Sequence, residues 1–411
     1  MPDELTFRSP RPDELHAYMA PLYLAFGEVP SSEQLEAERG VMEFDRSVGA
    51  LDGNEWVATA GAYSMRLTVP GGEVAVSAIT GVGVRPDFRR QGLLRDMMDW
   101  LFDDARKHEE PVAVLLASEA AIYQRFGFGQ ASMASSFSFD PTSTTFRRPV
   151  DLGPGARVRL VDPPEALPIF SRIYEQVRPR TPGALDRVEA RWRDWLLPDP
   201  EWLRHGDGVR LRALLEVDGE PRGFAIYRIQ QGWSATGPSE TLSVQEVIAL
   251  DPDAEQVLWE WLLSMVLVRT ITGRRAPVPH PLQHMLLEPR RLGLTVTDGL
   301  WLRILDLPAA LEARGYVGSG SLVVDVVDDM FEANVGRCEL AVADGRARVS
   351  RSDLAPDLEL DIAALAAAYL GGFRFVDLAV TGRVRACQEG ALERADALFT
   401  PSRSPWNATP F

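Results

Sequence analysis

A strand, a loop ending in glycine and an amphipathic helix follow one another directly, and this succession constrains the fold more than any other feature. Residues 74–84 are largely apolar and β-branched, and Pro86 restrains Arg85 to an extended conformation at the end of the strand. Over residues 93–108 apolar side chains recur three or four positions apart, which predicts a helix. The apolar run at 111–117 predicts a second strand, covered on both faces. The sequence therefore predicts a βαβ unit.

The loop of this unit, residues 87–92, reads Asp-Phe-Arg-Arg-Gln-Gly. A glycine at the start of a helix exposes backbone N–H groups, and these together with the helix dipole can bind a pyrophosphate. Arg89 and Arg90 add positive charge. If the preceding strand splays from its neighbour, the free backbone groups of residues 82–84 can hydrogen-bond an extended pantetheine arm. The alternative interpretation is an ordinary strand, loop and helix with solvated arginines.

A second recognisable segment follows the next strand. Residues 116–128 read Leu-Ala-Ser-Glu-Ala-Ala-Ile-Tyr-Gln-Arg-Phe-Gly-Phe, with a short helix predicted over 120–125. The two segments together resemble the GNAT acyltransferase superfamily, in which Arg/Gln-x-x-Gly-x-Gly/Ala is the acetyl-CoA loop and Tyr-x-x-Phe-Gly-Phe comes later. Here Leu94 stands at the last loop position. Arg-Arg-x-Gly-Leu-Leu, Ala-Ser-Glu-x-x-Ile-Tyr-x-Arg-Phe-Gly and a terminal phenylalanine are similar to the enhanced intracellular survival (Eis) family.

The resemblance implies three domains of α/β and α+β class, and the sequence changes character in the same order. An alternating strand at 132–139 and a loop of turn-forming residues close a catalytic GNAT domain at 1–140. Strands and helices alternate again in 146–298, including a helix expected over 254–269. No second Arg-Arg-Gln-Gly loop occurs there, so a degenerate GNAT-like domain is expected. Short strands and then helices at 299–411 fit a domain similar to sterol carrier proteins.

The resemblance also implies roles for individual residues. Tyr123 is expected to be the general acid, and the terminal carboxylate of Phe411 is expected to reach the N-terminal active site as the base. The alternative interpretations are that Tyr123 packs against Phe126 and Phe128, and that the tail frays. Some family members have an acidic residue where Pro410 stands, which puts one contact to a cationic substrate in doubt. The implied acetyl-CoA contacts are Val82, Gly83, Val84, Arg89, Arg90, Gln91, Gly92, Leu93, Leu94, Arg95, Ser118 and Glu119.

These roles are chemically consistent. Acetyl transfer needs a neutral amine, a polarised thioester carbonyl and a proton for the departing thiolate. A phenol with a pKa of about 10 is protonated at neutral pH and can donate to a thiolate of about 8.5, which suits Tyr123. A terminal carboxyl of about 3.5 is a poor base unless burial raises its pKa. The Phe411 carboxylate can instead act through water, or attract the cationic amine and hold it in line.

Charge and composition narrow the partners. The formal net charge of −16 argues against a nucleic-acid partner, which requires a basic face, and suits a cationic small molecule. The first twelve residues are polar and no apolar run approaches the ~20 residues of a membrane span, so we expect a cytoplasmic protein with no membrane partner. Cys338 and Cys387 are interpreted as packing residues. The family resemblance implies a homohexamer.

Two other clusters are weaker candidates for a site. His280 and His284 have the spacing of helical metal ligands, but Pro279 and Pro281 exclude a regular helix and no third ligand stands out, so no metal is expected. Tryptophans and arginines mix within 191–204, yet the acidic balance favours core packing over a nucleic-acid surface.

The sequence thus predicts an acetyl-CoA-dependent N-acetyltransferase that acts on primary amines of cationic small molecules, such as aminoglycosides or polyamines. The acceptor pocket is expected to include loops around Phe26, Glu28 and Glu33. Two alternatives stay open. One is a carrier or scaffold for an apolar ligand with a vestigial GNAT domain, against which the intact arginine loop counts. The other is acetylation of a protein lysine or a peptide terminus.

Overall fold

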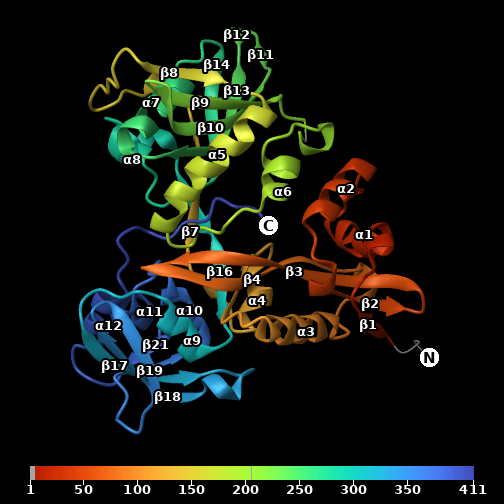
Figure 1. Cartoon of the computed structure of the whole chain (residues 1–411), viewed down its shortest axis with the longest axis vertical. Helices are drawn as coiled ribbons and strands as arrows, with labels where there is room; N and C mark the ends of the chain where they lie inside the picture. Colours follow the sequence, from red (N-terminus) through yellow and green to blue (C-terminus); the bar gives the residue numbers. More distant parts are fainter. Residues whose placement is uncertain (1–4, 205) are drawn as a thin grey trace. The chain divides into compact units, whose positions relative to one another are not determined.

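The computed structural model describes residues 5–204 and 206–411, which divide into two compact units (Figure 1). The first four residues of the predicted domain 1–140 lie outside this described part. Unit 1 joins the N-terminal third of the chain to most of its C-terminal quarter, and unit 2 is the middle of the chain with a short piece of the tail. Unit 1 comprises residues 1–132, 300–402 and 410–411, and unit 2 comprises residues 133–299 and 403–409.

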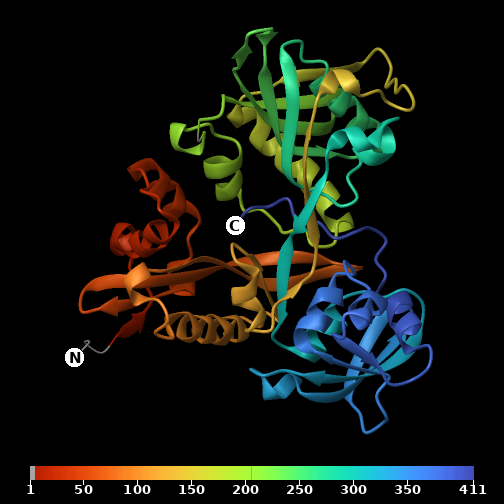
Figure 2. The ribbon, with the colours of Figure 1, turned by 180° about the vertical axis from the view of Figure 1, so that it is seen from behind.

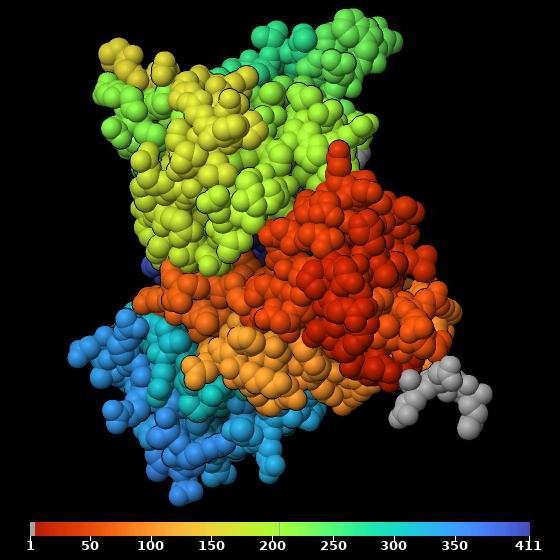
Figure 3. All heavy atoms as spheres, turned by 45° about the vertical axis from the view of Figure 1, so that its right-hand side comes forward, coloured from red at the N-terminus to blue at the C-terminus, as the bar shows by residue number. Residues whose placement is uncertain are grey.

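Unit 1 contains a seven-stranded sheet that carries the predicted βαβ unit. In sheet order its strands are β1 (Thr6–Arg8), β2 (Ser47–Asp52), β3 (Glu55–Val69), β4 (Gly72–Val84), β5 (Val112–Leu116), β16 (Leu300–Ile304) and β6 (Gly129–Gln130). Its helices are α1 (Leu15–Phe26), α2 (Ser32–Val41), α3 (Leu93–Lys107) and α4 (Ala120–Gln124). Strands β4 and β5 are parallel, and α3 connects them. Figure 3 shows in red the surface that α1 and α2 present.

Helix α3 begins and ends close to where its sequence predicts. Met97, Met98 and Phe102 lie on its apolar face and are fully buried in the core of the sheet. Lys107, in the last turn, complements the negative end of the helix dipole. The βαβ prediction is confirmed, and with it the α/β class of this part of the chain.

Unit 2 is built on a second seven-stranded sheet. In sheet order its strands are β15 (Thr295–Asp298), β7 (Met133–Phe139), β14 (Val268–Ala276), β13 (Glu240–Ala249), β10 (Glu220–Gln230), β9 (Arg210–Val217) and β8 (Ala156–Leu160). Its helices are α5 (Pro163–Val177), α6 (Glu189–Arg191), α7 (Pro252–Leu263) and α8 (Leu282–Met285), with a small hairpin of β11 (Trp233–Ser234) and β12 (Gly237–Pro238). Phe224 of β10 joins the apolar cluster of α5, and its neighbour Ala225 joins that of α7, so the two helices cover opposite faces of the sheet.

The helix predicted over 254–269 is too long. Helix α7 ends at Leu263, and the chain re-enters the sheet as β14 from Val268. The apolar run across this boundary has neither a glycine nor a proline, and periodicity alone does not separate a buried helix end from a buried strand. The β-branched residues Thr270 and Ile271 in β14, an interior strand of the sheet, were the available signal.

Two strands join a sheet that lies outside the domain in which the sequence places them. The strand predicted to close the first domain is β7, which pairs with β14 and β15 in the sheet of unit 2. Strand β16, inside the range predicted for the third domain, pairs with β5 and β6 in the sheet of unit 1. Figure 2 shows from behind the teal strands of the sheet that β7 joins. Alternation of apolar residues predicts which face of a strand is buried, but not which sheet it enters.

The remainder of unit 1 is an α+β layer pair, drawn in blue in Figure 1. Its five-stranded sheet has the order β19 (Arg346–Arg351), β18 (Gly336–Ala343), β17 (Gly320–Val327), β20 (Leu358–Asp361) and β21 (Val384–Ala386). The helices are α9 (Leu307–Ala313), α10 (Ile362–Tyr369), α11 (Phe375–Val380) and α12 (Ala391–Phe399). Buried Arg314 donates to the carbonyl oxygens of Tyr369 at 2.7 Å and Phe399 at 3.0 Å, and so satisfies the C-terminal ends of α10 and α12.

The two cysteines and the longest apolar helices can now be located in the structure. Cys338 is buried in β18, and both it and Cys387 are free thiols. Over the ranges that the structure describes, no helix combines the length and the apolar character needed to cross a bilayer.

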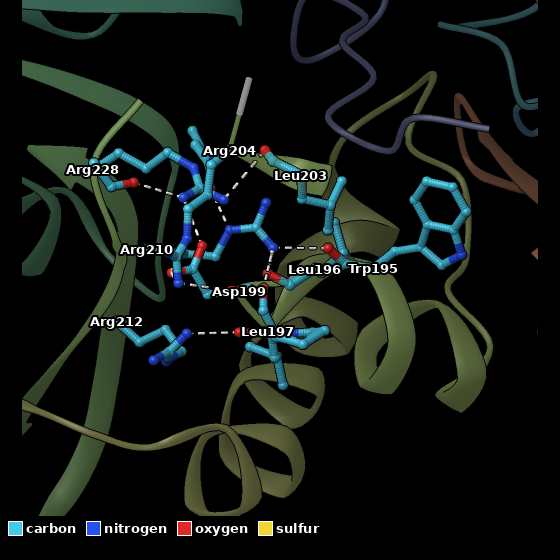
Figure 4. Close-up of polar contacts among 12 residues, drawn as sticks. Trp195, Leu196, Leu197, Asp199, Leu203, Arg204, Arg210, Arg212 and Arg228 are labelled. Atoms are coloured by element: carbon cyan, nitrogen blue, oxygen red, sulfur yellow. Dashed lines mark hydrogen bonds and ion pairs between the residues drawn. The ribbon is translucent and has the colours of Figure 1, made fainter. Parts of the chain in front are cut away.

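A cluster of arginines in unit 2 fixes the segment between α6 and β9 (Figure 4). One Nη atom of Arg210 donates to three carbonyl oxygens, those of residues 195, 196 and 198, at 2.8, 3.0 and 2.6 Å. Arg212 donates to the carbonyl of Leu197 at 2.6 Å, and Arg228 pairs with Asp199 at 2.6 Å. These carbonyls end a helical segment, where unpaired acceptors and the negative dipole favour cations. Burial lowers the pKa of Arg210 to about 10, so it stays charged at neutral pH.

Candidate active site

The parallel strands β4 and β5 separate part of the way along their length. They pair over three positions only, ending at Ala78 and Val114. On its other edge β4 stays paired with β3, past a β-bulge, to its last residue Val84. Residues 79–84 therefore face no strand of the described chain on the β5 side. Their free N–H and C=O groups form an open edge, to which an extended ligand can add as a strand would.

The predicted contacts Val82, Gly83 and Val84 all lie on this open edge. A Cβ atom on Gly83 would lie 2.6 Å from the Cα atom of Leu22 in helix α1. Any larger residue would push α1 away from β4, so glycine is needed for this close approach. Gly83 thus lets α1 pack directly on the strand that carries the edge.

The N-terminus of α3 is open at the end of the same strand. Gly92, the N-cap residue, has a φ of 91° and Arg90 has a φ of 65°, so the loop passes through left-handed conformations before the helix begins. No side chain of the described residues caps this helix start, which leaves backbone N–H groups available. Leu93 is buried in the core and Leu94 packs against it, which holds the first turn in place.

Cationic side chains surround this helix start. Arg89, Arg90 and Arg95 are exposed, and neither Arg89 nor Arg90 forms an ion pair within residues 5–204 and 206–411. Arg85, four residues earlier, is by contrast held by Asp87 at 2.6 Å. The uncommitted guanidinium groups and the open N–H groups together can hold a diphosphate.

Helix α4 follows β5 and carries the predicted acid. Ser118 and Glu119 are exposed at its start, as is Gln91 in the arginine loop. The ring of Tyr123 is buried and meets Phe128 edge-on, with ring centroids 6.0 Å apart. Its hydroxyl group makes no hydrogen bond with the described part of the chain. Burial raises the pKa of Tyr123, so the phenol keeps its proton at neutral pH. Tyr123 therefore packs against Phe128 and also keeps a protonated hydroxyl group, so the packing interpretation does not exclude the role of an acid.

The C-terminal tail is held by hydrogen bonds within unit 2. The hydroxyl of Thr409 accepts from the guanidinium of Arg187 at 2.9 Å and lies 3.0 Å from the hydroxyl of Tyr174. Arg187 is itself held by Glu246 at 2.6 Å. Pro410 and Phe411, the next and last residues, group with unit 1 and are half-buried. The tail is therefore anchored at Thr409, two residues before the end of the chain.

This anchor was absent from the sequence prediction. Thr409 and Arg187 are 222 positions apart, and neither belongs to a motif. The arginine cluster of Figure 4, which holds residues 195–199 further along the same segment, also lacks a sequence signature.

The predicted acceptor loop lies between α1 and α2. Phe26 is 56% exposed at the end of α1, and Val29 in the loop is 94% exposed. Glu28 and Glu33 are exposed beside them. Apolar side chains next to carboxylates form a surface suited to a cation with an apolar body.

The histidine pair and the tryptophan-rich segment, the two weaker candidates for a site, both contribute side chains to the packing of unit 2. His280 is buried, its ring packs edge-on against Phe137 with centroids 5.0 Å apart, and its Nδ1 atom accepts from the backbone of Leu282. Trp192 is buried in the core of unit 2, as its interpretation as a packing residue requires. In the described ranges no group of three or more potential metal ligands is gathered.

Comparison with domain families divides the chain into three. A family described as Acetyltransferase (GNAT) domain matches residues 6–131, and a second of the same description matches residues 183–304. A Sterol carrier protein domain family matches residues 307–408.

Relatives match over nearly the whole length. An uncharacterized N-acetyltransferase of Streptomyces avermitilis is 37% identical over 402 residues, 96% of this chain and 97% of its own. The N-acetyltransferase Eis of Mycobacterium tuberculosis is 36% identical over 410 residues, 96% of each chain. The crystal structure of Eis1 from Mycobacterium abscessus superposes with a TM-score of 0.83 and 30% identity, covering 99% of this chain and 100% of that one. A GCN5-related N-acetyltransferase from Anabaena variabilis, at 23% identity and a TM-score of 0.85, shows the same fold.

Proposed function

As a member of the Eis family of GNAT N-acetyltransferases, this chain is an acetyltransferase, and we propose that it moves the acetyl group of acetyl-CoA directly to a primary amine of a cationic small molecule. The observation that carries the proposal is the open edge of β4 beside the uncapped start of α3. These two features support a binding mode in which one coenzyme A molecule pairs its pantetheine arm with the strand edge and its diphosphate with the helix start.

The donor would lie along the crevice between β4 and β5. The backbone of Val82, Gly83 and Val84 would pair with the pantetheine arm, and an N–H of this edge would polarise the thioester oxygen. The N–H groups of the first turn of α3, from Gly92 onward, would bind the diphosphate, with Arg89 and Arg90 neutralising its charge. The further contacts proposed for the donor are Gln91, Leu93, Leu94, Arg95, Ser118 and Glu119.

Tyr123 would supply the proton to the departing thiolate. Its raised pKa keeps the phenol protonated, and its hydroxyl has no competing partner among the described residues. The thiol of coenzyme A, with a reference pKa of about 8.5, is the stronger acid, so the phenol acts by partial transfer or by a hydrogen bond that stabilises the leaving group.

The terminal carboxylate of Phe411 would receive the amine. An anion there attracts an ammonium group and orients it, and a water molecule can carry away the proton. The supporting observation is the buried anchor of Thr409, which orders the tail only two residues before the terminus. Exposed Glu28 and Glu33 beside Phe26 would favour polycationic acceptors, aminoglycosides or polyamines in class. By the same family resemblance we infer a cytoplasmic homohexamer.

The direct test incubates the native protein with acetyl-CoA and a panel of polyamines and aminoglycosides, and follows product by mass spectrometry. We expect products heavier by one acetyl group that form only when acetyl-CoA is present. Absence of product across the panel, in a protein that binds coenzyme A, would reject the acceptor class.

Deletion of Phe411 tests the tail. Because the deletion moves the carboxylate back by one residue, we expect turnover to fall by about 100-fold with acetyl-CoA affinity unchanged. Phe411→Leu keeps a carboxylate at the same chain position and is the matched control, with a smaller loss. Equal turnover of the deletion and the native protein would remove the tail from the mechanism.

A further inference from the structure

Unit 2 contains a second place where parallel strands diverge. Strands β13 and β14 pair as far as Val244 and Gly273, after which β13 continues to Ala249. On its other edge β13 stays paired with β10 past a β-bulge, as β4 does with β3 in unit 1. A cavity of 380 Å³ lies at this divergence, lined by residues 244–249 and 274–281. That volume falls in the range of small-molecule sites.

The walls of this cavity are mainly apolar and are held in place. Phe137, Val244 and Trp259 line its interior. The tail forms another wall through Trp406, whose indole Nε1 atom donates to the carbonyl oxygen of Arg275 at 2.7 Å. This hydrogen bond fixes the tail against the end of β14 and so holds that wall of the cavity in place.

A few polar groups interrupt the apolar lining. The indole Nε1 atom of Trp259, which is 3% exposed, makes no hydrogen bond of normal geometry with the described residues. Burial raises the pKa of the Glu255 carboxyl to about 7, against the opposing effects of Trp259 and Arg403. Glu255 is thus only partly ionised at neutral pH. The other lining carboxylate, Glu246, is already bound by Arg187 at 2.6 and 3.0 Å.

Three arginines line the same cavity outside any ion pair, and only Arg403 among them acts on a lining carboxyl, through its longer-range attraction to Glu255. Arg274, Arg275 and Arg403 are exposed, and none forms an ion pair with any described residue. The protein carries a net charge of −16, so this local excess of cations is not a property of its surface in general. Guanidinium groups left unpaired beside an apolar cavity match a ligand that carries an anion on an apolar body.

A phosphorylated ligand such as coenzyme A fits this second cavity poorly. The start of α7, which follows β13 as α3 follows β4, is capped by Asp251, whose side chain accepts from the backbone of Ala254 at 3.0 Å. Asp253 follows in the first turn. The Asp251 carboxylate thus occupies a backbone N–H that a diphosphate would need, and the arginines beside it are already committed, Arg222 to Asp251 and Arg148 to Asp253.

We propose that the cavity between β13 and β14 binds a small apolar monocarboxylate, with its apolar body between the strands and its carboxylate at Arg274, Arg275 and Arg403. The inference is independent of the acetyl-transfer function, because every residue in it belongs to unit 2. It also places apolar-ligand binding in the second GNAT-like domain rather than in the sterol-carrier-like domain.

Calorimetry on the full chain tests the proposal, with coenzyme A present in excess to block the crevice of unit 1. The probes are decanoate, decan-1-ol and decylamine, which share one apolar chain and differ in charge. We expect decanoate to bind at least about ten-fold more tightly than the alcohol, and the amine to bind weakest. The double substitution Arg275→Gln and Arg403→Gln should weaken decanoate by about ten-fold and leave decan-1-ol unchanged. Arg193→Gln, at an exposed arginine of unit 2 outside the cavity, is the matched control.

Each outcome decides the proposal. Equal binding of decanoate and decan-1-ol, an unchanged affinity in the double variant, or no binding of decanoate to the native protein would each overturn it. Crystals soaked with 10-bromodecanoate locate the ligand independently. A bromine peak between β13 and β14 supports the site, and a peak confined to unit 1 contradicts it. None of these results depends on whether the protein acetylates amines.

Discussion

The two GNAT-like sheets of this chain each contain a pair of parallel strands that diverge, and they differ in the helix that follows the first strand of the pair. In unit 1, β4 leaves β5 after Ala78, and in unit 2, β13 leaves β14 after Val244, each with a β-bulge on the opposite edge. The helix that follows starts at an uncapped Gly92 in unit 1 and at a self-capped Asp251 in unit 2. Each pair of diverging strands leaves a gap, called a slot here, and we propose that the cap of the following helix decides whether this slot can take a diphosphate.

The segments that follow β5 and β14, the second strand of each slot, carry side chains of different chemistry. After β5 the chain forms α4 and buries Tyr123, whose phenol can donate a proton. After β14 it continues into a proline-rich segment with His280, whose pKa burial lowers to about 4, so that the imidazole is uncharged at neutral pH. These differences support our proposals that the gap between β4 and β5 serves acyl transfer and that the gap between β13 and β14 holds an apolar ligand.

The largest expected effect is on catalysis and tests Tyr123, the proton donor that we propose for the slot of unit 1. Tyr123→Phe removes only the hydroxyl and should lower kcat by about 100-fold or more while leaving the KM for acetyl-CoA nearly unchanged. Tyr227→Phe removes a hydroxyl from a buried tyrosine of unit 2 and should leave kcat at the native value. Steady-state kinetics of both variants checks this, and similar kcat values for the two would show that Tyr123 only packs.

The next effect concerns the charge at the start of α3. Arg89→Glu combined with Arg90→Glu should weaken coenzyme A by about 100-fold, because two charge-assisted contacts to the diphosphate become repulsive. Lys107→Glu makes the same kind of charge change at the far end of the same helix and should alter affinity little. Isothermal titration of coenzyme A separates the two, and equal weakening would mean that only overall charge matters.

A smaller effect tests whether the Glu255 carboxyl, which lines the cavity between β13 and β14, is held uncharged. The pKa of Glu255 is raised from 4.5 to about 7, so the folded protein holds this proton more tightly than the unfolded chain. The carboxyl therefore costs stability progressively as the pH rises from 4.5 through 7, and the full cost is present above that. Glu255→Gln should raise the free energy of unfolding at pH 8 by about 3 kcal/mol and leave it unchanged at pH 4.

Denaturant unfolding at both pH values measures this difference. Glu220→Gln, at an exposed position of the same unit, is the control and should have no pH-dependent effect. A gain for Glu255→Gln that is equal at pH 4 and pH 8 would show that the carboxyl is not held uncharged.

The smallest effect concerns the cap of α7. Asp251→Ala should lower the free energy of unfolding by about 1 kcal/mol, whereas Asp251→Asn, which can still cap the helix, should cost less. Neither should create a second coenzyme A site, since unit 2 has no arginine loop at this helix start. Chemical denaturation and the stoichiometry of coenzyme A binding check both statements; two molecules bound per chain would contradict them.

Local patterns predicted the first slot well. The β-branched run ending at Arg85-Pro86 and the apolar period of 93–108 correspond to β4 and α3 within two residues, because strand and helix periodicity are properties of a few adjacent side chains. The motif around Tyr123 led to the Eis family, and both the family and the fold class are confirmed by relatives that match over the whole chain.

Long-range features escaped prediction for a common reason. The sheet that β7 enters, the insertion of β16 beside β5, and the hydrogen bond from Arg187 to Thr409 depend on residues more than a hundred positions apart. Nothing in the local composition of either partner specifies the other. The cavity between β13 and β14 was missed because it arises from the divergence of two strands, and the sequence predicted a helix up to residue 269, where β14 has already begun.

A crystal structure with coenzyme A tests the central claim most directly. The account predicts one molecule per chain, with its diphosphate against the backbone N–H groups that begin α3 and its pantetheine arm along Val82, Gly83 and Val84. A diphosphate at the start of α7, or a crevice between β4 and β5 that stays closed to the cofactor, would contradict it.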